Sequence, residues 1–157
     1  MRLRPAVLED AARLWDWAND AAVRAAAFDQ TPVAWERHLA WLTARLAAGC
    51  DPLLILETAE HQPIGQLRFD PVAEGWEVDF SVAAGARGRG YGTRLLAAGV
   101  AEARRYWPEG TRLIARVLAA NTPSLRICQR AGFVITEYGN DTGRPYARLE
   151  QQVHPGP

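Results

Sequence analysis

A nine-residue segment, ARGRGYGTR at residues 86–94, constrains the fold more than any other part of this sequence. It follows WEVDFSV (76–82), in which apolar and polar residues alternate as in a strand with one buried face. It precedes a segment with helical spacing, which we expect to run from about Tyr91 to Tyr106. Three glycines and three arginines stand at this junction, and no acidic residue lies between Phe80 and Ala101. Positive charge and unhindered backbone therefore gather where a strand is followed by a helix.

The composition of this loop favours an anion site. The N-terminus of a helix presents unpaired N–H groups and the positive end of the helix dipole. Glycine lets the backbone come close to a ligand, and Arg87 and Arg89 supply charge-assisted hydrogen bonds to phosphate. The alternative is a loop that only turns the chain, but a simple turn requires neither glycines at alternate positions nor arginines at a helix start. We therefore predict a phosphate-binding loop.

Three phosphate-binding patterns compete for this segment. The P-loop pattern Gly-x4-Gly-Lys-Ser/Thr requires a lysine that the segment lacks. The dinucleotide fingerprint Gly-x-Gly-x-x-Gly fails at its last position, which is Thr93, and requires an early βαβ unit that the element order does not provide. The third pattern, Arg/Gln-x-x-Gly-x-Gly/Ala, is met in full by Arg87-Gly88-Arg89-Gly90-Tyr91-Gly92.

The rest of the sequence predicts one globular domain. The 157 residues, of which 48% are apolar and 23% charged, suit a single core, which we place at 1–153 with a flexible tail at 154–157. A formal net charge of zero argues against nucleic-acid and polybasic membrane partners. Two cysteines make neither a disulfide framework nor a metal site. With no signal peptide or membrane span in the sequence, we expect a cytoplasmic protein that uses no metal.

Hydrophobic periodicity and turn residues predict the element order β-α-α-β-β-β-α-β-α-β-β, a mixed α/β domain. Thr31 and Pro32 are expected to start the second helix as N-cap and first helical residue, and Gly49 to end it. Asn121 is expected to cap the fourth helix. The expected strands are 2–6, 53–57, 63–70, 76–82, 112–118, 133–138 and 145–153, and the expected helices are 9–20, 32–48, 91–106 and 122–131.

A second signature lies near the C-terminal end: Asn121-x-x-Ser124-x-x-Ile127-Cys128-x-x-x-Gly132-Phe133. Together with the glycine-rich segment and the element order, it resembles the GCN5-related N-acetyltransferases, the GNAT superfamily, over nearly the whole chain. The first signature is the segment from Arg87 to Gly92. The resemblance implies an acetyl-CoA-dependent enzyme with about four helices and a mostly antiparallel mixed sheet of about seven strands. It also implies that a bulge near the middle of the fourth strand splays this strand from the fifth.

The resemblance implies where acetyl-CoA binds. Its pyrophosphate would lie on the backbone N–H groups of residues 88–93. Its pantetheine arm would pair like a strand with the backbone at Val82 and Ala83 and contact the side-chain amide of Asn121. The thioester would lie in the gap between the splayed strands, where a backbone N–H re-aimed by the bulge can hold its oxygen. The predicted cofactor-binding residues are Val82, Ala83, Arg87, Gly88, Arg89, Gly90, Tyr91, Gly92, Thr93, Asn121 and Ser124.

Transfer of an acetyl group to an amine requires a neutral nitrogen, and most alkylamines are protonated at pH 7. Glu77 and Asp79 lie on one face of the fourth strand beside the expected gap. Either carboxylate can accept a proton there or hold an ammonium group. The alternative is that both carboxylates belong to a solvated face of the sheet.

Cys128 occupies a position at which many family members carry a tyrosine that protonates the CoA thiolate. The cysteine either takes over this catalytic role as a thiol acid or only packs in the core. CoA thiolate is also a fairly good leaving group, so that no protein acid is required. Tyr138 and Tyr146 are the other candidates for the acid.

The first two helices form the acceptor pocket in proteins of this family. Here they carry aromatic, histidine and arginine side chains, with Trp35 and His38 three residues apart on one helical face. Such side chains suit a ring or nucleotide acceptor through stacking and phosphate contacts, unless they belong to the core. We predict that Asn19, Arg24, Trp35 and His38 contact the acceptor.

Two subgroups of the family are similar in this region. The segments from Trp17 to Asn19 and from His38 to Trp41 resemble the amino-sugar N-acetyltransferases of the pseudaminic-acid and related pathways, although Ala18 stands where those enzymes have arginine. The Trp-x-Asn pattern is shared with ribosomal-protein N-terminal acetyltransferases. We expect the amine of a nucleotide-linked amino sugar as acceptor. The alternatives are a protein N-terminus and a non-catalytic acetyl-CoA-binding module, and whether the chain forms a homodimer is left open.

Overall fold

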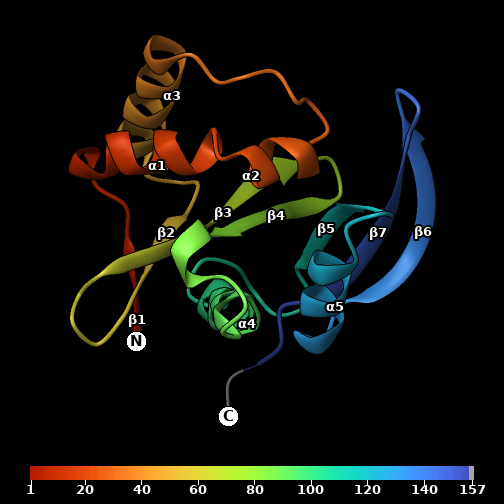
Figure 1. Cartoon of the computed structure of the whole chain (residues 1–157). Coiled ribbons are helices and arrows are strands. Elements are labelled where there is room, and N and C mark those ends of the chain that lie inside the picture. Colours follow the sequence, from red (N-terminus) through yellow and green to blue (C-terminus); the bar gives the residue numbers. More distant parts are fainter. Residues whose placement is uncertain (156–157) are drawn as a thin grey trace.

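The computed structural model describes residues 1–155 and shows one seven-stranded sheet with five α-helices and two short 3₁₀ turns (Figure 1). Part of the tail predicted at 154–157 therefore lies outside the described residues. The strands are β1 (Arg2–Pro5), β2 (Leu53–Glu57), β3 (Pro63–Val72), β4 (Gly75–Val82), β5 (Arg112–Leu118), β6 (Val134–Asp141) and β7 (Arg144–Gln152). The helices are α1 (Ala11–Ala18), α2 (Ala21–Ala26), α3 (Trp35–Ala48), α4 (Tyr91–Ala103) and α5 (Thr122–Arg130), and the 3₁₀ turns are η1 (Leu8–Asp10) and η2 (Ala84–Ala86).

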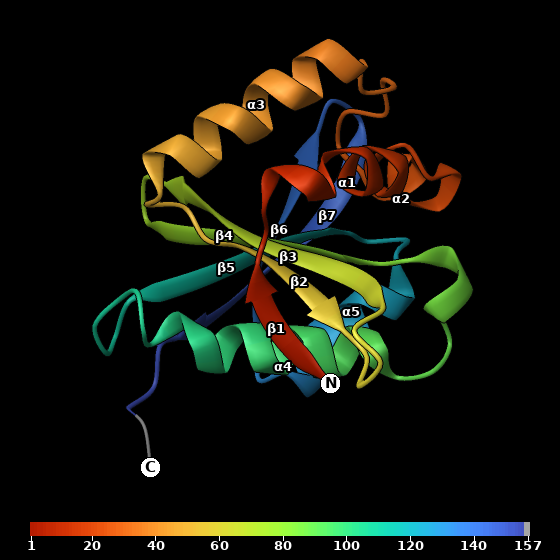
Figure 2. The same cartoon turned by 90° about the vertical axis from the view of Figure 1, so that its left-hand side faces the viewer.

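The sheet has the strand order β1-β2-β3-β4-β5-β7-β6. Every neighbouring pair is antiparallel except β4 and β5, which run parallel. Helices α1, α2 and α3 lie on one face of the sheet, and α4 lies on the other (Figures 1 and 2). The predicted mixed α/β architecture with seven strands is confirmed, with five α-helices in place of about four.

Strands β4 and β5 separate after a short contact. Their parallel pairing is confined to Trp76 and Glu77 of β4, whereas β5 pairs with β7 along its whole length. The splay predicted between the fourth and fifth strands is therefore confirmed. The bulge predicted in the fourth strand is wrong, because the β3–β4 hairpin keeps one register from end to end. The gap opens instead because β4 stays paired with β3 while β5 stays paired with β7, and the two pairs diverge.

Each face of the sheet carries its own apolar cluster. On the α4 side, Leu67 and Phe69 of β3 pack with Leu95 of α4, and all three are fully buried. Helix α4 comes this close because Gly99 has no side chain: a Cβ there would lie 2.4 Å from Leu67 Cδ1. On the other face, Leu42 of α3 belongs to a smaller cluster beneath α1 and α3. The sheet is thus covered on both faces around β2 and β3.

Helix α3 begins later than predicted. We expected Thr31 and Pro32 to start it, but its first residue is Trp35. The backbone of Val33 is held by distant side chains: its carbonyl accepts from Trp15 Nε1 at 2.7 Å and from Asn19 Nδ2 at 3.0 Å. Its N–H donates to Asn19 Oδ1 at 2.8 Å. These contacts from α1 keep the residues before α3 out of the helix.

Helix α2 was not predicted, because its six residues, AAVRAA, have no amphipathic stripe. The Asp20 side chain caps it and accepts hydrogen bonds from the backbone N–H groups of Ala22 and Val23 at 3.0 and 3.2 Å. An aspartate N-cap is therefore the local reason that the chain turns into a second short helix directly after α1.

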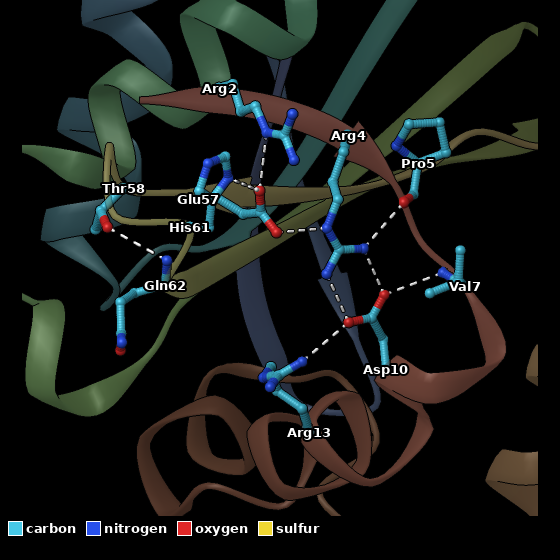
Figure 3. A network of polar contacts seen from close by, with 10 residues as sticks. All are labelled: Arg2, Arg4, Pro5, Val7, Asp10, Arg13, Glu57, Thr58, His61 and Gln62. Carbon is cyan, nitrogen blue, oxygen red and sulfur yellow. Dashed lines mark hydrogen bonds and ion pairs between the residues drawn. The ribbon is translucent and has the colours of Figure 1, made fainter.

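A network of charged side chains ties α1 to the first two strands (Figure 3). Arg4 donates to both oxygens of the buried Asp10 carboxylate, at 2.7 and 2.8 Å, and Arg13 donates to the same group at 2.9 Å. Arg4 and Arg2 also donate to Glu57 on β2. Their hydrogen bonds lower the pKa of Glu57 to about 2. This network fixes the position at which α1 leaves the sheet.

Candidate active site

A central cleft of about 1120 Å³ lies between the helices α1–α3 and the splayed strands β4 and β5. Its lining includes the glycine-rich loop, the start of α4 and one side of α5. The splay opens the sheet beneath the cleft, and the glycine loop closes one end of it. The loop predicted to bind phosphate and the helices predicted to bind the acceptor therefore border the same cavity.

The glycine-rich loop has the backbone geometry that its sequence predicts. Gly88 and Gly90 both have a φ of +76°, a left-handed conformation that favours glycine, and Gly90 is the N-cap of α4. A Cβ at either position would have open space within 4 Å. Within residues 1–155, none of the backbone N–H groups of residues 88–93 donates a hydrogen bond. Six neighbouring donors are thus available to an anion at the N-terminus of α4.

Gly92 brings the start of α4 against α5. A Cβ at Gly92 would lie 2.7 Å from Ile127 Cδ1, so any larger residue there would require the Ile127 side chain to move. Asn121 caps α5 as predicted: its Oδ1 accepts from the backbone N–H of Ser124 at 3.3 Å. The amide nitrogen of Asn121 makes no hydrogen bond within residues 1–155, and both residues line the cleft. Asn121 can therefore cap the helix and still donate to a ligand.

Two arginines of α5 also line the cleft, and the sequence analysis missed them. Arg126 and Arg130 are exposed and four residues apart, so they share one face of the helix. Their i, i+4 spacing beside the Asn121 signature is the signal that could have found them. They extend the positive charge of the glycine loop onto α5.

The free edge of β4 presents backbone groups to the gap. Ala83 N–H donates to Ile64 of β3 at 2.9 Å, and in an antiparallel pair the bonding direction alternates from residue to residue. The backbone groups of Phe80 and Val82 therefore face away from β3, where β5 no longer pairs. Of the two residues predicted to pair with pantetheine, Val82 faces the gap, and the N–H of Ala83 is used within the sheet.

Arg87 links the glycine loop to Asp20, the N-cap of α2. Its Nε donates to the Val82 carbonyl at 2.9 Å, and its Nη2 donates to Asp20 at 2.8 Å. Arg89 differs: it lines a smaller cavity of about 460 Å³ on the outer side of the loop, and Tyr91 lines both cavities. The loop thus directs its two arginines to different places.

The two predicted carboxylates have different surroundings. Glu77 forms a two-pronged ion pair with Arg116 of β5, at 2.9 and 3.2 Å, and does not line the cleft. Asp79 lines the cleft, and its Oδ1 accepts from Gln66 at 2.9 Å and lies 3.2 Å from Arg68. Glu77 therefore joins β4 to β5 at the point where they separate, and Asp79 is the carboxylate that a ligand in the cleft would meet.

The candidate acids lie outside the cleft lining. Cys128 is fully buried in the α4-side core, where burial raises the pKa of its thiol to about 12. Tyr138 is exposed on β6. Tyr146 of β7 packs edge-on against Phe28 with ring centroids 5.4 Å apart. These surroundings suit packing better than proton transfer to a ligand in the cleft.

Some of the residues predicted to contact the acceptor hold the elements around the cleft together, and others line the cleft. Asn19 holds Val33, as described above, and Trp35 packs edge-on against Trp15. His38 is buried, and its Nε2 lies 2.9 Å from the Ala11 carbonyl. Burial lowers the pKa of His38, so the ring is neutral near pH 7. Of the four, the cleft lining includes Arg24 and His38.

The lining of the cleft is strongly basic within the part of the chain that the structure describes. Asp79 is its one acidic residue. Three of the eight arginines in the lining form ion pairs with carboxylates, and the other five form none within residues 1–155. An excess of one charge in the wall of a cavity attracts the opposite charge. The cleft therefore favours anionic ligands along most of its length. Its eight arginines are Arg24, Arg37, Arg68, Arg87, Arg116, Arg126, Arg130 and Arg144.

Comparison with known proteins agrees with this geometry. The family model described as "Acetyltransferase (GNAT) domain" matches residues 1–134. The chain therefore belongs to the GNAT acetyltransferase family, and the prediction that it is an N-acetyltransferase enzyme is confirmed. The search of curated protein sequences found no match.

Solved structures of the same fold are numerous. The ribosomal-protein-alanine N-acetyltransferase of Brucella melitensis is 28% identical, with a TM-score of 0.82 over 97% of this chain and 99% of that one. YncA of Salmonella typhimurium, solved with its cofactor acetyl-CoA, is 26% identical, with a TM-score of 0.81 over 100% and 97%. The spermidine N-acetyltransferase of Vibrio cholerae, solved with CoA and spermine, shares the fold at 13% identity, with a TM-score of 0.84 over 97% and 95%.

Among residues 1–155, no cluster of three or more histidine, cysteine, aspartate or glutamate side chains is arranged to hold a metal ion. No helix in the same range combines the length and the apolar character needed to cross a bilayer.

Proposed function

We propose that this protein transfers the acetyl group of acetyl-CoA to a primary amine of a nucleotide-linked amino sugar. The observation that carries the proposal is the basic cleft between the glycine loop and the helices α1–α3, where five of the eight lining arginines form no ion pair within residues 1–155. A nucleotide-linked acceptor brings a diphosphate and acetyl-CoA brings further phosphates, and both suit such a cleft.

The fit to acetyl-CoA rests on three features of the cleft. The unpaired N–H groups of residues 88–93 suit a pyrophosphate, and the open edge of β4 at Val82 suits an extended amide-bearing arm. The amide nitrogen of Asn121 adds a donor beside that edge. Acetyl-CoA would supply an activated thioester at the gap between β4 and β5.

Among the residues beside the gap, a carboxylate would accept the proton that the acceptor nitrogen must lose. Asp79 takes a proton from the acceptor ammonium, directly or through water, and frees the lone pair of the nitrogen. The C–N bond then forms as the C–S bond breaks, and the second proton lost by the nitrogen balances the one that the departing thiolate gains. Glu77 stays paired with Arg116 and keeps the ends of β4 and β5 together.

The acceptor side supports a small anionic molecule over a polycation. Arg37 is exposed on α3, lines the cleft and makes no ion pair within residues 1–155, so it is available to a phosphate. Arg24 has two of its nitrogens bound to backbone carbonyls, which fixes its guanidinium at the cleft wall. Polyamines and aminoglycosides would meet repulsion from these groups.

A protein N-terminus is the second candidate, favoured by the 28% identity to the Brucella enzyme. The segment after α2 weighs against it. Arg144 of β7 donates to the carbonyls of Ala25 and Ala27, and Phe28 packs on Tyr146. These contacts bridge the segment around the end of α2 and the β6–β7 hairpin. They narrow the cleft on the side from which an extended peptide would enter.

The test is release of CoA from acetyl-CoA, followed with a thiol reagent, across a panel of amines. The panel contains UDP-linked 4-amino-deoxy sugars, free amino sugars, spermidine, an aminoglycoside and short peptides with free N-termini. We expect turnover with a UDP-linked amino sugar and little with the polycations. Turnover that is faster with peptides would move the function to protein acetylation, and turnover that is faster with spermidine would refute the charge argument.

A further inference from the structure

Helix α2 is held at both ends by side chains from other elements. All six of its residues are partly or fully exposed, and a helix of this length is marginal on its own. At its N-terminus the capping residue Asp20 accepts a hydrogen bond from Arg87. At its C-terminus Arg144 of β7 donates to the carbonyl of Ala25, at 2.8 Å, and to that of Ala27. The helix therefore depends on contacts with the glycine loop and with β7.

The chain that follows α2 is braced by its own side chains. Arg24 donates to the carbonyls of Asp29 and Thr31, at 3.0 and 3.2 Å. The N–H of Thr31 donates back to the Asp29 carboxylate at 2.9 Å. Val33, which follows this segment, is fixed to α1 by the contacts described above. Residues 21–32 therefore hold together as one unit between two fixed ends, and we call this unit the flap.

The flap crosses the gap between the splayed strands. Its residues 22–27 line the cleft, and so does Arg144, to which the flap is bonded. Helices α1 and α3 cover the sheet around β2 and β3, whereas β7 lies beyond both β4 and β5 in the strand order (Figure 1). A contact from α2 to β7 therefore has to pass over the place where β4 and β5 separate.

Phe28 makes the aromatic contact of the flap on the far side of the gap. Its ring packs edge-on against Tyr146 of β7, with ring centroids 5.4 Å apart. The guanidinium of Arg116, on β5, lies over the Phe28 ring at 4.9 Å from its centroid. The same guanidinium forms the ion pair with Glu77 of β4. The contact of the flap thus reaches the ion pair that joins β4 to β5.

We infer that the flap is a gate over the gap between β4 and β5, and that Phe28 and Arg144 latch it and so determine which acceptors enter. This inference rests on the proposed function and deepens it, because it gives a physical reason for the preference for a small acceptor. An extended peptide would have to pass between α2 and β7, where the latch lies. A segment with exposed residues and few external contacts opens at a small cost in free energy, as the lids of other enzymes do.

The test measures how fast a thiol beneath the flap reacts with reagents of two sizes. Ser81→Cys places this thiol in the cleft lining, on the face of β4 that carries Asp79. The exposed Cys50 of the same chain is the internal reference. Chloroacetamide is the small reagent, and a hexapeptide with a chloroacetylated N-terminus is the large one. Mass spectrometry of proteolytic fragments gives the labelling rate at each cysteine.

We expect the ratio of the hexapeptide rate to the chloroacetamide rate to be several-fold lower at the introduced cysteine than at Cys50. Phe28→Ala and Arg144→Gln, each combined with Ser81→Cys, should raise this ratio about five- to tenfold, because each removes one contact of the latch. Equal ratios at the two cysteines of the parent would overturn the inference. Ratios that neither substitution changes would also overturn it.

Matched variants separate the latch from a general loss of stability. Arg148→Gln is the same substitution on the same strand, but Arg148 binds Glu74 and lies outside the cleft lining. Tyr138→Ala removes an exposed aromatic ring from the same hairpin. Both variants should label like the parent, and acceleration equal to that of the latch variants would refute the latch. Hydrogen exchange of the backbone amides of residues 22–28 should be faster in the latch variants alone.

The outcome is separable from that of the proposed function, because the labelling needs neither acetyl-CoA nor an amine. A flap that labels as expected, in a protein that does not acetylate a UDP-linked amino sugar, would refute that acceptor and leave the gate in place. The gate also predicts that CoA release with short peptides is faster in Phe28→Ala and Arg144→Gln than in the parent. Peptide turnover that rises in neither variant would refute the control of acceptor choice by the flap.

Discussion

Arg87 on the glycine-rich loop donates to the carboxylate of Asp20, the N-cap of α2, at 2.8 Å. One ion pair thus joins the predicted phosphate loop to helix α2. The bond from Arg87 lowers the pKa of Asp20, so the pair is fully charged near pH 7. A phosphate on the loop would compete with Asp20 for the Arg87 guanidinium.

We therefore predict that Asp20→Asn raises the affinity for acetyl-CoA about two- to fivefold. This factor corresponds to the free energy of the partly exposed ion pair that no longer has to be broken. Asparagine caps helices as well as aspartate, so the free energy of unfolding should change by less than about 1 kcal/mol. Calorimetric titration with acetyl-CoA measures the first effect. Glu102→Gln, which breaks the exposed Glu102–Arg105 pair on α4, is the control and should leave the affinity unchanged. Weaker acetyl-CoA binding by Asp20→Asn would instead mean that Asp20 holds Arg87 in the position from which it binds the ligand.

Gly90→Trp should abolish acetyl-CoA binding and leave the fold intact. Gly90 has a left-handed φ and open space around its missing Cβ, so a side chain there costs about 1–2 kcal/mol of strain and fills the anion site. Gly110, between α4 and β5, has a φ of +83° and equally open space but lies outside the cleft. Gly110→Trp should therefore show the same loss of stability with normal binding. Equal binding by both variants would remove the phosphate site from this loop.

The parts of the fold that depend on local chemistry could be predicted from the sequence. The alternation in 76–82 and the glycines at 88–92 determine a strand, a loop and a helix start within one short segment, and the structure agrees. The start of α3 could not be predicted in this way. It is set by Trp15 and Asn19, which bind Val33 from another helix, and these contacts override the local signal of Thr31 and Pro32.

The same distinction applies to the candidate site, whose local features could be predicted and whose contacts between distant segments could not. The glycine loop and the Asn121 cap are continuous in sequence and were found there. The grouping of the arginines that line the cleft and the hydrogen bond between Gln66 and Asp79 depend on which strands are neighbours and on their register. A single sequence does not carry that register, so the contact between Gln66 and Asp79 can be seen only once β3 and β4 are aligned.

Glu57→Gln should destabilise the protein in a pH-dependent way. Hydrogen bonds from Arg4 and Arg2 depress the pKa of Glu57 from 4.5 to about 2 in the folded state. The stabilisation is therefore complete above the unfolded-state pKa and is lost as the pH falls through about 2. At pH 7 we expect a loss of about 2 kcal/mol in the free energy of unfolding, measured with urea.

The control for this prediction is the same measurement at low pH. Between pH 4.5 and pH 2 the difference between parent and Glu57→Gln should shrink, because the parent carboxylate itself becomes protonated. Arg2→Ala, which removes the more exposed of the two partners, should cost less than Glu57→Gln. A difference in stability that does not depend on pH would show that the ion pairs contribute through packing alone.

Cys128→Ala should leave kcat within about twofold of the parent, because a thiol with a pKa of about 12, buried in the core, is a poor proton donor to a group in the cleft. The free energy of unfolding should fall by about 1 kcal/mol, as expected for a small core truncation. Steady-state CoA release gives kcat, and urea unfolding gives the stability. Cys50→Ala, the same substitution at the exposed cysteine, should change neither. A hundredfold fall in kcat for Cys128→Ala, with normal acetyl-CoA binding, would instead make this thiol the acid that protonates the leaving group, since a positioned acid contributes a factor of this size.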